Sequence, residues 1–400
     1  MPSTQPSLNI AIVGGGPSGL TLAAILKKIG VQFTVFELDA SRDARGQGGM
    51  LDVHKRSGQL ALKKAGLIDQ FRKAMRVDAT EIYVRDRKGT VYLHHSEEGE
   101  DDPERPEIDR AVLRRILLDA LDPDTVRWGK KLKEAEVVTE DGKERAFRLH
   151  FADGSAAEGF NIVIGADGTW SKVRRLRSDV RPPYVGITVV ATNITPSNPS
   201  YPAISDFVGK GSCMAAGGNN IIMSQKNGDG SIRTYAMITT PEEWKDNSGI
   251  DWTSQRAALI QFADEFYGDW SDELRALIIE CDEGELAFRP LYQFPPGYTF
   301  EKDCTGVTLL GDAAHVLTPF TGIGVNVAMN DAYDLASAIE KVASEGLSVD
   351  DAFAEYEKDI FARATLNATR TDREQEVYFT GKPMSEVLKG LARAFDGSEI

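Results

Sequence analysis

The 400-residue sequence predicts an α/β fold with a parallel, doubly wound sheet, an inserted, mostly antiparallel sheet and helices at the C-terminal end. Three observations lead to this prediction. Residues 8–37 contain a strand, a glycine-rich turn, a helix and a second strand, in that order. Two later apolar strands, near residues 163 and 308, each end at an Asp. Between them, residues 184–239 form short β-prone runs separated by Pro, Gly and Asn, which is typical of antiparallel sheets.

The first of these stretches begins with an apolar, largely β-branched run at residues 9–13, which is typical of a buried parallel strand. Gly14, Gly16 and Gly19 follow in G-x-G-x-x-G spacing. The next segment carries four apolar residues at helical spacing, which are Leu22, Ile25, Leu26 and Ile29. A second strand is predicted at residues 33–36.

Each part of this stretch has a physical role in binding a dinucleotide. Gly14 would make the strand-to-helix turn, Gly16 would let a diphosphate approach the backbone, and Gly19 would let the helix pack closely. The helix N-terminus presents free N–H groups and a positive dipole end to the phosphates. Glu37, after the second strand, would accept hydrogen bonds from a ribose diol. The stretch therefore predicts a dinucleotide site, and the alternative is a glycine-rich turn without a ligand.

The composition is that of a globular protein, and the net charge of −15 disfavours nucleic acids and anionic membranes as partners. Cys213, Cys281 and Cys304 are far apart and odd in number, so they predict neither a disulfide framework nor a metal site. The N-terminal residues lack the basic start of a signal peptide, and no run approaches about 18 apolar residues. We therefore expect a cytoplasmic protein without a membrane span or a bound metal.

Helices and strands follow one another through the rest of the first half. A helix is expected at residues 57–67, then a strand hairpin at 80–95 and an acidic loop at 97–107. Another helix is expected at residues 108–121. Further strands are predicted at residues 125–128, 133–139, 146–151 and 160–164.

The second half begins with β-prone runs and ends in helices. The β-prone runs are residues 187–194, 201–208, 219–224 and 232–239. Helices are expected at residues 252–267, 271–281, 351–376 and 384–395 and from residue 322 onward, with a buried strand at 307–310. These elements predict a discontinuous first domain (residues 1–75, 100–180 and 300–345), an inserted domain (76–99 and 181–299) and a C-terminal helical segment (346–400).

Two further motifs place an Asp just beyond an apolar strand, where ligands bind in a doubly wound sheet. Asp167 follows one of these strands and precedes Ser171 and Arg174. Asp312 follows the other and precedes a glycine-containing helix start, which includes Pro319, Gly322, Gly324 and Asn326. Alternatively, each Asp would cap the helix that follows its strand.

Together the three motifs resemble those of the FAD-dependent aromatic hydroxylases, the single-component flavoprotein monooxygenases with the p-hydroxybenzoate hydroxylase fold. The resemblance covers most of residues 8–345 and implies a Rossmann-like FAD-binding domain with an inserted substrate-binding domain. Within this family, residues 45–55, 107–110 and 319–322 look most like the tetracycline-inactivating flavin monooxygenases.

The resemblance implies a set of residues that would contact FAD. They are Gly14, Gly16, Gly19, Glu37, Arg45, Asp52, Arg110, Asp167, Asp312, Pro319, Gly322, Gly324 and Asn326. Glu37 would bind the adenosine ribose, Arg110 the flavin side chain or phosphates, and Asp312 the ribityl chain. Asp167 lies in the motif linked to both FAD and NAD(P)H. Alternatively, Arg110 would pair with Asp109 or a neighbouring Glu on its helix surface.

The resemblance also implies substrate contacts, for which ordinary packing is the alternative. The residues are Met214, Met223, Arg233, Tyr235 and Phe320. The chain departs from the tetracycline-inactivating enzymes at Ser212, Arg233 and Tyr235, where those enzymes carry Arg, His and Gly. Leu38 stands where an Arg usually follows the ribose acid and helps to hold NADPH, and Ile323 stands where a Gln is common.

The activity implied by the resemblance is that of a monooxygenase. FAD, reduced by NADPH or NADH, would activate O₂ as a C4a-hydroperoxyflavin and transfer one oxygen atom to a phenolic, polycyclic or alkaloid-like molecule. No catalytic side chain is expected, so His315 is predicted to be structural. A monomer or weak homodimer is expected. The alternatives are a reductase, epoxidase or Baeyer–Villiger oxygenase on this fold, or a flavin-free binding protein.

Overall fold

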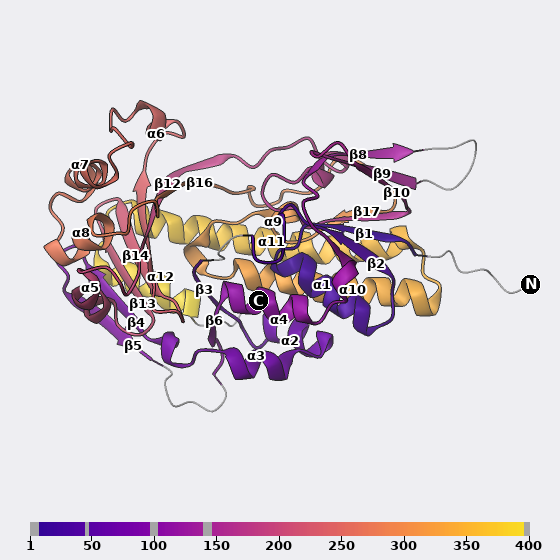
Figure 1. Cartoon of the computed structure of the whole chain (residues 1–400), viewed down its shortest axis with the longest axis horizontal. Coiled ribbons are helices and arrows are strands. Elements are labelled where there is room, and N and C mark those ends of the chain that lie inside the picture. Colours follow the sequence, from indigo (N-terminus) through magenta and orange to yellow (C-terminus); the bar gives the residue numbers. More distant parts are fainter. Residues whose placement is uncertain (1–7, 45–47, 97–102, 139–145, 396–400) are drawn as a thin grey trace, which may run out of the picture.

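A computed structural model of the chain describes residues 8–44, 48–96, 103–138 and 146–395. Two large sheets dominate the structure and lie toward opposite ends of the molecule (Figure 1). One is a parallel sheet of five strands, and the other is a mostly antiparallel sheet of seven strands. Long C-terminal helices run between them (Figure 1). This architecture confirms the predicted fold class.

The parallel sheet brings together strands that are far apart in the sequence. Its order is β17 (Val307–Leu309), β11 (Ile162–Gly165), β1 (Ile10–Val13), β2 (Phe33–Phe36) and β7 (Val126–Arg127). Every neighbouring pair in this order is parallel. Strand β1 lies in the middle, and all its residues are buried. Helices pack on one face of this sheet, and on the other face Phe36 of β2 contacts Phe151 and Phe160 of the three-stranded sheet described below.

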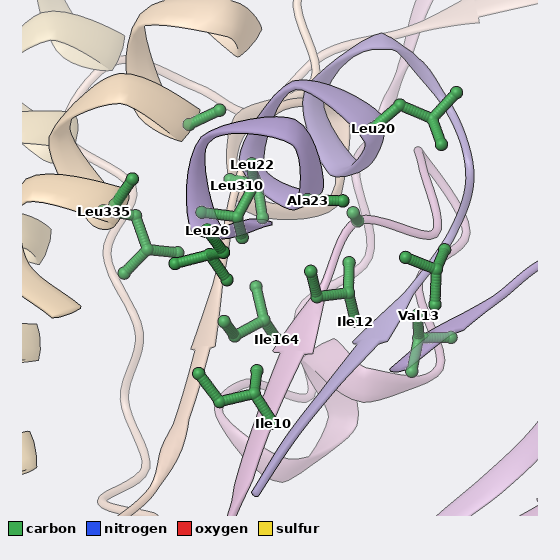
Figure 2. Packing of buried hydrophobic residues seen from close by; sticks show 14 of the residues in the cluster. Ile10, Ile12, Val13, Leu20, Leu22, Ala23, Leu26, Ile164, Leu310 and Leu335 are labelled. Carbon is green, nitrogen blue, oxygen red and sulfur yellow. The ribbon is translucent and has the colours of Figure 1, made fainter. Parts of the chain in front are cut away.

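Helix α1 (Pro17–Lys28) covers the centre of this sheet. In Figure 2, its apolar side chains form one layer with those of β1 and β11, and Leu335 of helix α10 (Gly324–Glu345) joins this layer. Ile10 and Ile12 are fully buried there, and burying each such side chain contributes about 1.5–3 kcal/mol. Helices α2 (Gly58–Ala65) and α4 (Arg110–Asp119) pack beside α1. This packing fixes the position of the glycine-rich turn between β1 and α1.

The second sheet has seven strands. Its order is β16 (Ala287–Tyr292), β12 (Tyr184–Ile194), β15 (Ile232–Thr239), β14 (Asn220–Lys226), β13 (Ser212–Gly217), β4 (Ile82–Asp86) and β5 (Val91–His95). All pairs are antiparallel except β13 with β4, which is parallel. One face packs against four helices, α5 (Tyr201–Val208), α6 (Trp244–Asn247), α7 (Gln255–Tyr267) and α8 (Asp272–Ile279). The opposite face packs against Phe320 and the C-terminal helices.

The remaining elements are short. A three-stranded sheet contains β8 (Leu132–Val138), β9 (Ala146–Phe151) and β10 (Ala156–Phe160), and a two-stranded ribbon pairs β3 (Met50–Asp52) with β6 (Glu107–Asp109). The short helices are α3 (Ile68–Ala74), α9 (Asp312–His315), η1 (Asp78–Thr80), η2 (Pro123–Thr125), η3 (Val173–Leu176) and η4 (Pro319–Thr321).

The prediction of a strand at residues 201–208 is wrong, because this segment forms helix α5. Pro202 lies in the first turn of the helix, where its missing N–H has no partner to lose. Ile204 and Val208, four residues apart, are buried on one helical face against the sheet. Gly209 ends the helix with φ 86°. Helical spacing of the buried residues therefore outweighs the β-prone composition.

Several strands lie where none was predicted. They occupy residues 50–52, 107–109, 156–160, 212–217 and 287–292. Strand β13 reads SCMAAG, and this small-residue sequence has weak intrinsic β propensity. It is nevertheless central in its sheet, with β14 and β4 on its two sides. Tertiary pairing, rather than local propensity, creates this strand.

Helix α11 (Val349–Phe379) links the two ends of the molecule. Near its start, the Tyr356 hydroxyl donates a hydrogen bond of 2.9 Å to the Leu309 carbonyl at the end of β17. Near its end, Tyr378 and Phe379 pack against the seven-stranded sheet, as do residues of α12 (Met384–Phe395). Within the described ranges, no helix combines the length and apolar character that a membrane crossing requires. The proposed domain boundaries stay a prediction.

Candidate functional site

The three sequence motifs meet at the carboxyl edge of the parallel sheet. The Ala166 amide donates a hydrogen bond of 2.7 Å to the Val13 carbonyl, and the Leu310 amide donates one of 2.9 Å to the Gly165 carbonyl. These bonds place the ends of β1, β11 and β17 side by side. The turn with Gly14, the loop with Asp167 and the loop with Asp312 therefore lie next to one another, as predicted for a ligand site in this fold.

The three motif glycines have three different environments. Gly14 has φ 114°, and a Cβ there would lie 2.1 Å from the Ala166 carbonyl oxygen. A Cβ at Gly19 would lie 2.1 Å from the Gly14 carbonyl oxygen, so α1 packs directly on the turn. A Cβ at Gly16 would meet nothing within 4 Å. Gly14 and Gly19 are thus required by packing, whereas Gly16 keeps open space beside the helix start.

The N-terminus of α1 offers that space to an anion. Gly16 is the N-cap residue, no side chain caps the helix, and the first turn contains no acidic residue. Free N–H groups and the positive end of the helix dipole therefore face the open side of Gly16. The donor set and the missing side chain both fit the diphosphate of a dinucleotide.

Glu37 lies directly beside this turn and is buried. Its Oε2 accepts a hydrogen bond from the Gly15 amide, and its Oε1 accepts one of 3.0 Å from the Asp39 amide. The carboxylate thus stabilises the glycine loop itself. Each carboxylate oxygen accepts more than one hydrogen bond, so acceptor capacity remains for a ribose.

Asp167 caps the turn that follows its strand. Its Oδ1 accepts a hydrogen bond of 2.5 Å from the Ser171 hydroxyl, and its Oδ2 accepts one of 2.6 Å from the Lys172 amide. Burial raises the pKa of Asp167, although these hydrogen bonds oppose the change. Within the protein, Asp167 thus caps the turn that follows its strand, which is the alternative to a cofactor contact considered from the sequence.

Arg174 joins the loops that contain Asp167 and Asp312. Its Nη2 donates a hydrogen bond of 2.7 Å to the Thr169 carbonyl, and its Nη1 donates one of 2.9 Å to the Ala313 carbonyl. The side chain is buried, and its guanidinium lies over the Phe294 ring. This one side chain holds the two loops at a fixed separation.

Asp312 is not a helix cap, because Gly311 occupies the N-cap position of α9 and Asp312 is the first helical residue. Asp312 as a whole residue is exposed to solvent. The protein atoms around its carboxyl nevertheless shield that group from water and raise its pKa, while the charges of His315 and Arg110 oppose this effect. Arg110, the first residue of α4, is therefore close enough to act on Asp312 electrostatically. The structure brings these two predicted cofactor residues together.

A buried ionic network supports the Asp312 loop, and its two residues from α10 and α11 were not predicted from the sequence. Asp331 accepts a hydrogen bond of 2.6 Å from His315 Nε2 and one of 2.9 Å from the Gly311 amide. Its other oxygen accepts one of 3.0 Å from Arg363 of α11. His315 is buried and its Nε2 is hydrogen-bonded to Asp331, which is consistent with the structural role expected for it. A carboxylate at helical spacing inside an apolar helix face was the only available sequence signal.

The start of α10 resembles that of α1 in being open. No side chain caps it, and its first turn has no acidic residue. A Cβ at Gly322 or Gly324 would meet nothing within 4 Å, and Pro319 is exposed beside them. Asn326, in contrast, is fully buried and its side chain bonds to the protein. It accepts a hydrogen bond of 2.7 Å from the His54 amide and donates one of 2.9 Å to the Asp52 carbonyl.

Asn326 thereby attaches the β3–β6 ribbon to α10. In this ribbon, Asp52 is paired in register with Glu107, and Asp52 Oδ2 lies 2.7 Å from His54 Nε2. The Oε2 atom of Glu107 is buried and has no hydrogen-bond partner among the described residues. Burial and the neighbouring Asp52 raise the pKa of Glu107 well above its ordinary value. Arg45, also predicted as a cofactor residue, lies outside the described residues.

The predicted substrate residues share one face of the seven-stranded sheet. Met214 is paired with Met223, and Met223 with Tyr235, so these three side chains lie side by side. They belong to the apolar cluster that also contains Phe320, and Met214 is 5% exposed. Arg233 projects from the same face, two residues along β15 from Tyr235. Packing and substrate contact are therefore both compatible with the methionines.

No group of three His, Cys, Asp or Glu side chains in the described part of the chain is arranged to hold a metal ion. The site consists instead of glycine turns, uncapped helix starts and single carboxylates, and these features suit an organic cofactor.

Comparison with known families agrees with this description. A family profile described as "FAD binding domain" matches residues 7–226 and 299–371, which include the three motifs and both uncapped helix starts.

Two curated relatives cover most of this chain. The monooxygenase asqM of Emericella nidulans is 29% identical over 385 residues, covering 84% of this chain and 85% of the relative. A chloroplastic zeaxanthin epoxidase of an Oncidium hybrid cultivar is 30% identical over 393 residues, covering 89% of this chain and 54% of the relative.

Solved structures share the fold at lower identity. Klebsiella pneumoniae HpxO, complexed with FAD and uric acid, superposes with a TM-score of 0.74 at 21% identity, covering 98% of this chain and 93% of that one. The tetracycline destructase Tet(51) superposes with a TM-score of 0.72 at 18% identity, covering 97% of this chain and 96% of that one. These two likenesses concern the fold alone.

Proposed function

The chain belongs to the FAD-binding-domain family, and as it is an FAD-dependent monooxygenase, we propose that it inserts one oxygen atom of O₂ into a phenolic, polycyclic or alkaloid-like small molecule. NAD(P)H is the electron donor typical of the family. The observation that carries the proposal is the meeting of three motif loops beside the open, uncapped start of α1.

The residues present fit FAD. The α1 N-terminus and Gly16 would hold the diphosphate, and Glu37 would hold the adenosine ribose. Asp312 and Arg110 would hold the ribityl chain and its phosphate. The open glycines at the start of α10 leave room for a planar ring, whose electron-rich edge would face free N–H groups.

Bound FAD would supply the oxygen-transfer chemistry. The residues of this chain would do the binding, orienting and exclusion of water. Asn326 would act indirectly, because its side chain holds the β3–β6 ribbon against α10. Phe320 and the methionines of β13 and β14 would present an apolar surface to the substrate and keep water from it.

The position of Leu38 bears on the nicotinamide coenzyme. Leu38 is 51% exposed directly after Glu37, so it offers no charge to a 2′-phosphate. We therefore propose that the coenzyme binds transiently and that the choice between NADH and NADPH rests on other residues.

Epoxidation is the second candidate, because a relative that covers most of this chain carries the name zeaxanthin epoxidase. The same bound cofactor would serve either reaction, and the substrate would decide between them. A flavin-free binding protein is the less favoured alternative, since Glu37, Asp167 and Asp312 are all present and gathered.

The test follows NADPH and O₂ consumption by the FAD-loaded protein with a panel of phenols, polycyclic ketones and alkenes. Mass spectrometry then identifies products. A gain of one oxygen atom, with one NADPH consumed per product, supports the proposal. Protein that stays colourless and binds no added FAD would refute it.

A further inference from the structure

Four polar side chains form a row across the middle of the seven-stranded sheet. The register pairs Ser212 with Gln225, Gln225 with Arg233, and Arg233 with Asn193. Directly paired residues project from the same face of a sheet. This is the face that carries Met214 and packs against Phe320 and α11, whereas the helices α5 to α8 cover the opposite face.

Three side chains of this row, those of Ser212, Gln225 and Arg233, have no partner among the residues that the structure describes. The Nε atom of Arg233 is buried and has no hydrogen-bond partner. Among the residues that the structure describes, no ion pair or hydrogen bond includes the side chain of Arg233, Gln225 or Ser212. Nearby Arg76 differs, because it donates a hydrogen bond of 2.8 Å to the Lys226 carbonyl and lies 3.6 Å from Asp109.

An unpaired guanidinium in this position is costly for the protein alone. A half-buried cation loses part of its hydration, and no carboxylate of the described chain compensates it. Arg also presents its N–H donors in a planar fork that matches a carboxylate. The missing partner is therefore expected to be an anion that comes from outside the described part of the chain.

The row faces the loop that leads to the predicted cofactor residues. Arg233 Nη1 lies only 3.2 Å from where a Cβ at Gly48 would be, and the Tyr235 hydroxyl lies 2.8 Å from where a Cβ at Gly49 would be. The Gly49 carbonyl accepts a hydrogen bond of 3.1 Å from the Arg110 amide. The two glycines therefore let this loop lie close against the side chains of Arg233 and Tyr235, where a larger residue would collide with them.

Polarity falls steadily across the same face. The row next to Arg233 contains Met214, Met223, Tyr235 and Ala191. The row after that contains Ala216, Ile221, Met237 and Val189. One end of this face is therefore suited to an ionised group and the other to an apolar ring system.

We propose that Arg233, with Gln225 and Ser212, binds a carboxylate or an equivalent anionic oxygen group of the substrate, while its ring system lies along the methionine row. The inference rests on the proposed function, because it assigns a class of substrate to that enzyme: aromatic or polycyclic acids rather than neutral molecules.

The experiment compares two probes of nearly equal shape, 2-naphthoate and the neutral 2-naphthamide. Their binding to the full-length, FAD-loaded protein is measured calorimetrically at pH 7 without NADPH, so that no turnover occurs. The wild-type protein should bind the acid more tightly. Arg233→Gln should weaken binding of the acid by about 10- to 100-fold and leave the amide nearly unchanged. Arg233→Lys should restore part of the preference.

Two variants make the result specific. Arg72 is exposed on α3, so Arg72→Gln makes the same charge change elsewhere and should leave both affinities unchanged. Gln225→Leu should weaken binding of 2-naphthoate by a smaller factor than Arg233→Gln does. It provides a second test if Arg233→Gln lowers the melting temperature.

Several outcomes would overturn the inference. These are equal affinity of the wild type for the two probes, binding of neither probe at millimolar concentration, or an unchanged preference in Arg233→Gln. The proposed function is judged separately by oxygen transfer with NADPH. An active monooxygenase without preference for the acid would thus refute only the substrate class.

Discussion

At the scale of single residues, the three motif glycines separate structural requirements from ligand requirements. Gly14 and Gly19 lie where a Cβ would be 2.1 Å from a carbonyl oxygen, whereas Gly16 has nothing within 4 Å. The motif spacing predicts all three equally, because sequence alone does not tell which glycine the protein needs for its own packing. Of the three, only Gly16 has space beside it for a bound molecule.

We predict opposite effects for two glycine substitutions. Gly16→Val should leave the unfolding free energy of the apoprotein within about 0.5 kcal/mol of wild type and weaken FAD binding at least tenfold, since the side chain fills the open space. Gly19→Ala should destabilise the apoprotein by about 1–3 kcal/mol, because α1 must shift. Urea unfolding and FAD fluorescence titration measure the two effects. Equal loss of stability in both variants would contradict this division.

Glu107 should make stability fall as pH rises. Burial, followed by the charge of Asp52, raises its pKa well above 4.5, so the folded protein retains a proton that the unfolded chain releases. The unfolding free energy should therefore decrease from pH 4.5 upward until the folded pKa is reached. Glu107→Gln, which is neutral at every pH, should flatten this part of the profile. Urea unfolding at pH 5 and pH 7.5 tests it.

The matched control is Glu104→Gln, since Glu104 is exposed on the segment that leads to β6. This variant should keep the wild-type slope between the two pH values. A wild-type slope in Glu107→Gln would show that the buried carboxyl is not the source.

At the scale of elements, the helices reveal where pattern reading succeeds and fails. The apolar stripe of α1 appears in the sequence and lies buried on the parallel sheet. Residues 201–208 carry β-prone residues, yet Pro202 and the spacing of Ile204 and Val208 belong to a helix. Strand β13 was missed because its stability depends on neighbours that are distant in sequence.

The contacts between elements were the least predictable part of the site. Asp331 and Arg363 lie on two different helices and support His315 and Gly311 from behind. No motif marks them, because their role arises only when α11 packs against α10. Arg174 was noted in its motif, but the connection that it makes to the Asp312 loop was not.

The pair formed by His315 and Asp331 should stabilise the fold most at low pH. Burial lowers the pKa of His315, but the charge and hydrogen bond of Asp331 outweigh this and raise it above 6.5. The stabilisation is therefore complete below pH 6.5 and is lost as pH rises through the folded pKa. The difference in unfolding free energy between wild type and His315→Asn should be largest near pH 6 and shrink by pH 9.

The exposed His95 supplies the control, because His95→Asn changes the same residue type on the surface. Its difference from wild type should stay small at both pH values. A constant difference for His315→Asn would mean that the ionised pair does not contribute.

At the scale of the whole molecule, the order of the motifs along the chain was enough to predict a discontinuous parallel sheet with an inserted antiparallel one. Membership of these strands in one sheet could be anticipated because each motif follows the end of a strand, and such ends gather at one edge. The order of the strands was not predicted. The way the second sheet faces the first could not be anticipated, since it depends on Phe320, α11 and α12 packing on one face.

Loading with FAD should stabilise the entire protein. A ligand that binds only the folded state at about 100 times its Kd contributes roughly 2.7 kcal/mol. The melting temperature of the holoprotein should exceed that of the apoprotein by several degrees, and added FAD should restore it. Gly16→Val should show little of this increase. A holoprotein that melts with the apoprotein would argue against tight binding.

Helix α11 has a mechanical consequence. Near its start, Tyr356 is hydrogen-bonded to Leu309 of the parallel sheet. In its last turn, Tyr378 and Phe379 pack against the seven-stranded sheet. A force applied at the carboxyl end would first detach α12 and then the last turn of α11 from the sheet. This would expose the apolar face of β12 to β15 while the parallel sheet stays folded. Optical-tweezer traces should therefore show two separate rips, the smaller one first.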